Sequence, residues 1–95
     1  MNKIDYDLAK NIKNIHKHGL SFETAAQAFN DPNAQTIYDD YHSMTEDRYI
    51  LLGAVGSHIL LVIYTMRDEK IRMISARPAT KREEEMYYKS PRGLL

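Results

Sequence analysis

Residues 59–64 read Ile59-Leu60-Leu61-Val62-Ile63-Tyr64, an unbroken apolar run. Because successive side chains of a strand point to opposite faces, this run is apolar on both faces, which is typical of a central strand. The next apolar segment, 70–75, mixes charged and apolar residues and suits a position nearer the sheet edge. The run therefore predicts a sheet built around residues 59–64.

Four segments rich in β-branched, aromatic and aliphatic residues predict strands, at 35–41, 48–55, 58–66 and 70–76. Short connections at 53–57 and 67–69 have the length of hairpin loops, so neighbouring strands are expected to pair antiparallel. Pro78 ends the last strand, because it forces the preceding residue into an extended conformation.

Two helices are predicted before the sheet and one after it. In residues 6–18, Leu8, Ile12 and Ile15 recur at helical spacing, with Asp7 as a cap and Gly19 as the stop. A second helix begins at the N-cap Ser21 and ends at the breaker cluster 30–33. We expect these two helices to form a hairpin that packs a shared apolar face on the sheet.

The last predicted helix opens with a capping box of Thr80 and Glu83 and runs to about residue 88, followed by a short tail at 90–95. With 95 residues, of which 43% are apolar and 27% charged, the chain is expected to form one domain over 1–95. The predicted fold class is α+β: a helical hairpin on an antiparallel sheet of four or five strands, with a C-terminal helix.

Composition excludes several classes of site. The absence of cysteine rules out disulfides, thiolate metal sites and cysteine nucleophiles. His16 and His18 stand two residues apart and do not face each other on a helix, so we expect no metal site and no cofactor. The apolar run is far shorter than the roughly 20 residues of a membrane-spanning helix. We expect a soluble, cytoplasmic protein without a processed leader and without membrane contact.

The net charge of zero hides an asymmetry along the chain. Residues 1–63 carry five cations and eight acids, a net charge of −3, whereas residues 64–95 carry eight cations and five acids, a net charge of +3. Arg67, Arg72 and Arg77 belong to the last two predicted strands, which pair through a tight turn. Arginines gathered on a sheet bind phosphates well, although a solvated charged face has the same composition.

Several separate blocks of the chain resemble the BrnT toxin family and follow one another in the order found in that family. They are Lys17-His18-Gly19-Leu20-Ser21-Phe22-Glu23 with Ala25-Ala26 and Phe29-x-Asp31-Pro32, His42-Ser43-x-x-Glu46-x-Arg48, Val62-Ile63-Tyr64-Thr65-x-Arg67, and Ile71-Arg72-x-Ile74-Ser75-Ala76-Arg77-x-Ala79 before Arg82-Glu83. The resemblance covers about residues 5–88. Tyr6 and Tyr49 stand where we expect tryptophan in the family, and Ser57-His58 replaces a Gly-Arg pair.

The resemblance implies a RelE-like fold and a ribonuclease toxin that blocks translation. It also implies a cognate BrnA-type antitoxin as partner, with RNA as the substrate and DNA contacted only indirectly, through the antitoxin complex. We expect the antitoxin to cover the basic surface of the sheet. A catalytically inactive RNA-binding or protein-binding module of the same fold remains an alternative.

A ribonuclease without a metal uses the 2′-hydroxyl of the RNA as nucleophile, and protein groups must move protons and stabilise charge on the phosphorus. The predicted catalytic residues are His18, Lys17, Arg67, Arg72, Arg77 and, more weakly, Tyr88. The predicted RNA contacts are Lys10, Arg48, Tyr64, Lys81 and Arg82. The arginines would bind the scissile and flanking phosphates, and His18 or Lys17 would act as acid or base.

Overall fold

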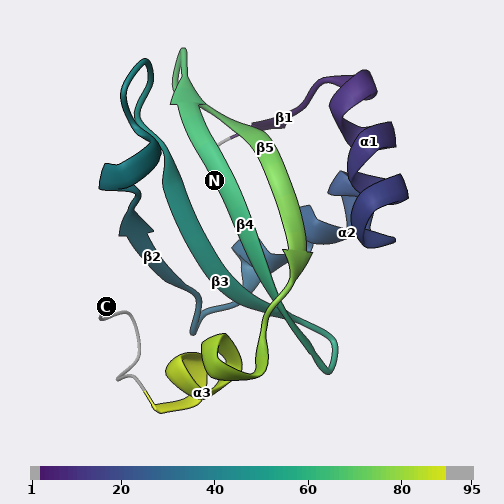
Figure 1. Cartoon of the computed structure of the whole chain (residues 1–95), viewed down its shortest axis with the longest axis vertical. Helices are drawn as coiled ribbons and strands as arrows, with labels where there is room; N and C mark the ends of the chain where they lie inside the picture. The colour runs from purple at the N-terminus through teal and green to yellow at the C-terminus, as the bar shows by residue number, and fades with distance from the viewer. Residues whose placement is uncertain (1–2, 90–95) are drawn as a thin grey trace.

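The structure of the chain is a computed structural model that describes residues 3–89. A five-stranded sheet has the order β1-β5-β4-β3-β2. Its strands are β1 (Ile4–Asp5), β2 (Gln35–Tyr38), β3 (Tyr49–Val55), β4 (His58–Arg67) and β5 (Lys70–Pro78). Figure 1 shows β4 running through the middle of the sheet, which confirms the central place predicted for residues 59–64. The predicted tail at 90–95 lies outside the described residues.

The sheet is mixed, so the prediction of a wholly antiparallel sheet is wrong at one edge. β2, β3, β4 and β5 pair antiparallel as expected, but β1 pairs parallel with β5, with Ile4 opposite Ile71. β1 has only two residues and no periodic pattern, which is why the sequence did not reveal it. β2 is also shorter than predicted, because the chain turns into the 3-10 helix η2 (Asp40–His42).

The helices begin and end where their caps predict. α1 (Leu8–His18) is capped by the Asp7 carboxylate and stops at Gly19, whose φ of 67° is the left-handed conformation that glycine adopts easily. α2 (Phe22–Ala26) is capped by Ser21 and continues as the 3-10 helix η1 (Gln27–Asn30). α3 is Lys81–Lys89. The Thr80–Glu83 capping box forms in both directions, with distances of 2.8 and 3.2 Å.

Apolar side chains cover both faces of the sheet. On one face α2 and η1 close over a core of Phe22, Ala25, Ala28, Leu51, Leu60, Val62, Met73 and Ala76. η1 comes so close to β3 that a Cβ on Gly53 would lie 2.7 Å from the carbonyl oxygen of Ala28. On the other face Tyr87 of α3 packs with Leu52, Ile59 and Leu61. We call this second surface the α3 face of the sheet.

The expected packing of α1 is wrong, and the helical hairpin with a shared apolar face is not confirmed. Leu8, Ile12 and Ile15 lie on the solvent side of α1, and the residue that α1 buries is Asn14. Figure 1 shows α1 beside the β5 edge of the sheet. Helical periodicity correctly predicts that these three residues share one side of a helix, but it does not say which side meets the sheet.

Asn14 holds α1 in this orientation. Its Oδ1 accepts a hydrogen bond from the Ala76 backbone N–H at 3.1 Å, and its Nδ2 donates to the Ala76 carbonyl at 2.7 Å and to the Leu20 carbonyl at 2.9 Å. Ala76 lies on β5 beyond the part that β1 covers, so one side-chain amide takes the place of a neighbouring strand. A buried backbone group left without such a partner costs free energy.

We expect Asn14→Ala to lower the free energy of unfolding by about 2–5 kcal/mol, because it leaves buried N–H and C=O groups without partners. Asn11→Ala is the graded control. It removes a single bond, from the Phe22 N–H to Asn11 Oδ1 at 2.8 Å, and should cost about 1 kcal/mol. Urea denaturation measures both values. An Asn14→Ala loss no larger than that of Asn11→Ala would show that the amide does not hold the helix.

Arg77 and Glu83 join β5 to α3 through two parallel hydrogen bonds of 2.8 and 2.9 Å. These bonds from Arg77 lower the pKa of Glu83, burial acts against them, and the Thr80 N–H lowers it further. A carboxylate whose pKa is lower in the folded state stabilises the fold above its unfolded pKa, and that stability is lost as the pH falls through the folded pKa.

Glu83→Gln should therefore lower the melting temperature at pH 7 and lower it less at pH 3, because the stabilising contribution of the carboxylate declines as the pH falls below its unfolded pKa. Thermal unfolding followed by circular dichroism at both pH values measures the difference. Glu85→Gln, an exposed position on the same helix, is the matched control and should have little effect at either pH. A Glu83→Gln deficit that is equal at pH 3 and pH 7 would contradict the proposed coupling.

Candidate functional site

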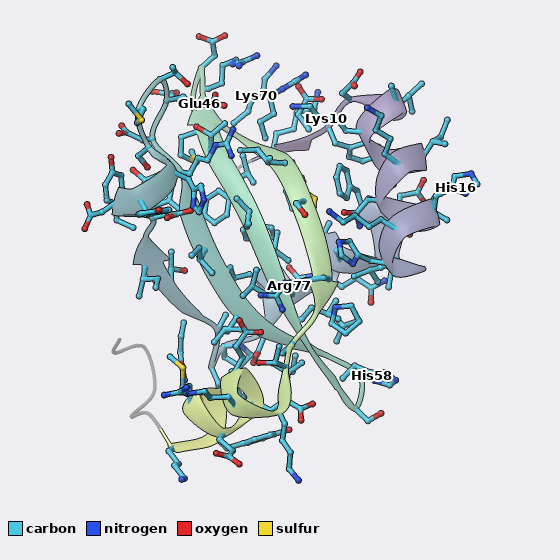
Figure 2. All side chains as sticks on the ribbon, in the orientation of Figure 1. Lys10, His16, Glu46, His58, Lys70 and Arg77 are labelled. Atoms are coloured by element: carbon cyan, nitrogen blue, oxygen red, sulfur yellow. The ribbon has the colours of Figure 1, made fainter. Side chains whose placement is uncertain are left out.

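The three predicted arginines of the last two strands share the α3 face. Arg77 is opposite Leu61, Arg72 is opposite Thr65, and Arg67 is opposite Lys70. Leu61, Thr65 and Arg67 alternate along β4 and so point to the same side of the sheet. Figure 2 shows Arg77 over this face. The sequence prediction that the tight turn brings Arg67 close to the Arg72 strand is confirmed by this register.

Each of these arginines contacts a carboxylate. Arg77 is held by Glu83 as described above, and these bonds raise the pKa of Arg77 although burial lowers it. Arg72 lies 3.5 Å from Asp5, and Arg67 lies 3.5 Å from Glu46. Arg48, also predicted to contact RNA, shares Glu46 at 3.8 Å. A phosphate that binds here must compete with, or displace, a carboxylate.

A second set of cations lies in a groove between α1 and β5. Its walls are formed by Lys10, Lys13, Asn14, Lys17 and His18 of α1 and by Ile74 and Ser75 of β5, around a volume of about 260 Å³. We call it the α1–β5 groove. The groove brings together three of the predicted site residues, Lys10, Lys17 and His18. Among residues 3–89, the three lysines of this groove form no ion pair with a carboxylate.

The groove and the arginines meet at Ser75. This residue lines the groove, and its pairing with Ile63 places it on the α3 face between Arg72 and Arg77. A β-bulge between Ile63 and Tyr64 shifts the register here, so that Tyr64 pairs with Met73 and Ile74 is the extra residue. The edge of β5 therefore separates a lysine-lined groove from an arginine-bearing face by the width of one strand.

Sequence reasoning missed two residues near this site. Lys13 lines the groove, and the helical spacing of Lys10, Lys13 and Lys17 was the signal that could have included it. His58, on the β3–β4 hairpin, lines a pocket of about 210 Å³ together with His18, Leu20, Val55 and Leu60. His18 thus lines both the groove and this pocket. The contact between α1 and the hairpin is tertiary, and no local pattern indicates it.

The other predicted residues lie elsewhere. Tyr64 is on the opposite face of the sheet, stacked on Tyr49 and edge-on to Phe29, and burial raises the pKa of its hydroxyl. Tyr88 is exposed on α3 and contacts the Tyr87 ring, whereas no α3 residue lines the α1–β5 groove. Lys81 and Arg82 are exposed at the start of α3. The roles of all four stay predictions.

The described part of the chain contains no helix long and apolar enough to cross a membrane. None of the curated proteins compared with the chain matches it. The family model described as ribonuclease toxin, BrnT, of type II toxin-antitoxin system matches residues 6–83. This match spans most of the chain, both sides of the α1–β5 groove and the three arginines of the α3 face. The chain therefore belongs to the BrnT family of ribonuclease toxins of type II toxin-antitoxin systems.

Proposed function

We propose that this chain is a metal-independent endoribonuclease that inhibits translation, acts in the cytoplasm, and is neutralised by a BrnA-type antitoxin. Membership of a ribonuclease toxin family supports the reaction class. The observation that carries the choice of site is the meeting of the α1–β5 groove and the arginine face at Ser75. Together they form a cationic surface suited to the phosphates of a single RNA strand. A RelE-like fold is part of this proposal.

The lysines of the groove are the first contacts for the RNA backbone. Lys10, Lys13 and Lys17 have no carboxylate partner among the described residues, so their charge is available to a polyanion. Three lysines spaced three or four residues apart lie along one side of a helix. A strand that follows this side passes His18 at the last turn of α1.

His18 is the proposed acid or base of the reaction. A histidine side chain ordinarily exchanges protons between pH 5 and 8, whereas a lysine or tyrosine needs a large fall in pKa to act as a base at neutral pH. Lys17 and Tyr88 remain weaker candidates for this role. The 2′-hydroxyl attacks the adjacent phosphorus, the bond to the 5′-oxygen breaks, and a 2′,3′-cyclic phosphate and a 5′-hydroxyl result. One proton leaves the 2′-oxygen and one reaches the 5′-oxygen.

Arg72 and Arg77, which lie on either side of Ser75 on the α3 face, supply positive charge for the phosphorane, with Arg67 beside a flanking phosphate. A guanidinium binds two oxygens of a carboxylate or of a phosphate in the same planar geometry. Arg77, which Glu83 already holds in this geometry, is therefore oriented for an oxyanion before RNA arrives. A phosphate of the RNA binds Arg77 by displacing the Glu83 carboxylate.

The purified chain, free of antitoxin, should cleave an end-labelled RNA in EDTA and leave a 2′-deoxy substrate intact. His18→Ala should lower the cleavage rate by about 100-fold or more, the usual contribution of a general acid or base. His16→Ala is the matched control, because Figure 2 shows His16 pointing away from the sheet. Equal rates for the two variants would remove His18 from the reaction. Failure of the wild type, with and without ribosomes, would favour an inactive RNA-binding module.

Binding is measured separately from cleavage with an uncleavable 2′-deoxy strand. If the groove lysines contact phosphates, each alanine substitution at Lys10, Lys13 or Lys17 should reduce the slope of log K against log salt by about 0.7. Lys3→Ala, at an exposed position in front of β1, is the control and should leave the slope unchanged. Unchanged slopes in all three groove variants would show that the RNA backbone lies elsewhere.

A further inference from the structure

α1 exposes a row of large aliphatic side chains. Leu8 is 71% exposed, Ile12 is 58% exposed and Ile15 is 44% exposed. Positions i, i+4 and i+7 lie on one side of a helix, so the three side chains form a continuous stripe. We call these three residues the α1 stripe. They contribute little to the core of the chain, since Asn14 is the residue through which α1 is buried.

An outward-facing stripe of this kind is unusual for a surface helix. Amphipathic helices place their apolar side toward the core and their polar side toward water. Single exposed apolar residues are common, whereas a contiguous exposed row marks a contact with another molecule. The hydrogen bonds of Asn14 to Ala76 keep the polar side of α1 toward the sheet, so the stripe cannot rotate inward without breaking them.

The charges around the stripe define the chemistry of the partner. α1 carries three lysines and two histidines and no acidic residue. His16, four residues after Ile12, lies beside the stripe, Lys13 lies next to His16 further round the helix, and Lys17 lies on the opposite side, in the α1–β5 groove. A partner that suits this helix therefore presents apolar side chains flanked by carboxylates. Nucleic acid lacks the aliphatic groups that the stripe requires.

We propose that the α1 stripe is the docking site of the antitoxin, which contacts it with an acidic amphipathic segment. The inference rests on the proposed function, because the type II family provides the antitoxin as partner. Apolar side chains of the antitoxin cover Leu8, Ile12 and Ile15, and its carboxylates face His16 and reach Lys13 beyond it. Since Lys13 also lines the groove, docking on the stripe withdraws one of the three groove lysines from RNA. One helix thereby links antitoxin binding to weaker RNA binding.

The test uses the full chain and a BrnA-type antitoxin, with the dissociation constant measured by calorimetry. Ile12→Glu and Ile12→Lys both remove the central anchor, and both should raise the dissociation constant by about tenfold or more, as loss of an anchor residue does in other interfaces. Ile12→Glu should have the larger effect, because it also repels carboxylates. Met44→Glu makes a comparable change at a side chain that is 92% exposed in another region, and should change affinity less than about twofold.

Two further measurements keep the interpretation specific. RNA cleavage by the free Ile12 variants and their melting temperatures should match those of the wild type, because Ile12 lies outside the core and the groove. Growth assays should then show variants that stay toxic in the presence of the antitoxin. Wild-type affinity for the antitoxin in both Ile12 variants would overturn the docking site.

The competing occupant is a second copy of the chain. Sedimentation of the free wild type and of Ile12→Glu distinguishes it: a dimer that the substitution splits, with antitoxin affinity unchanged, would assign the stripe to self-association and overturn the proposal. A failure of the proposed ribonuclease activity can be distinguished from a failure of the proposed docking site. A wild type that binds the antitoxin without cleaving RNA would remove the enzyme, and the Ile12 variants would still decide the docking site.

Discussion

The hydrogen bonds between the Asn14 amide and both backbone groups of Ala76 determine how the two ends of the chain fit together. β1 covers β5 only around Ile71 and Arg72, so the strand edge further along needs another partner. A helix cannot supply paired backbone groups sideways, but one amide side chain presents a donor and an acceptor at once. Because Asn14 must face the sheet, the lysine side of α1 forms the groove with β5 and the aliphatic side faces water.

Asp31 has a comparable role on the other side of the molecule. Its carboxylate accepts hydrogen bonds from the Ala54 N–H of β3 at 2.8 Å and from the Tyr87 hydroxyl of α3, and so joins η1, the sheet and the last helix. Burial raises the pKa of Asp31, but these bonds and that of the Asn33 N–H outweigh it and lower the pKa overall. The carboxylate thus stays ionised, and α3 is held over the sheet beside Arg77.

Local patterns predicted the parts of the fold that are encoded locally. The central strand follows from residues 59–64, and the ends of α1 and α3 follow from Asp7, Gly19 and the Thr80–Glu83 box. The orientation of α1 was missed because it depends on a contact between residues 62 positions apart. For the site, the tight turn correctly brought the arginines together, whereas Asp5 and Glu46 reach Arg72 and Arg67 only through tertiary packing.

The balance of charge becomes intelligible once the ion pairs are known. The formal net charge is zero, yet the described acids do not neutralise the cations evenly. Glu46, Asp5 and Glu83 pair with the arginines of the α3 face, while the lysines of the α1–β5 groove form no ion pair among residues 3–89. In a first step, unpaired lysines attract a polyanion from a distance. In a second step, a phosphate binds a paired arginine only where it can displace the carboxylate and form the same two hydrogen bonds. In the proposed function, this arrangement gives weak general affinity for nucleic acid and one local, oriented site for an RNA strand. An acidic partner that docks on α1 and pairs with Lys13 weakens the first of these two steps, the attraction of the polyanion.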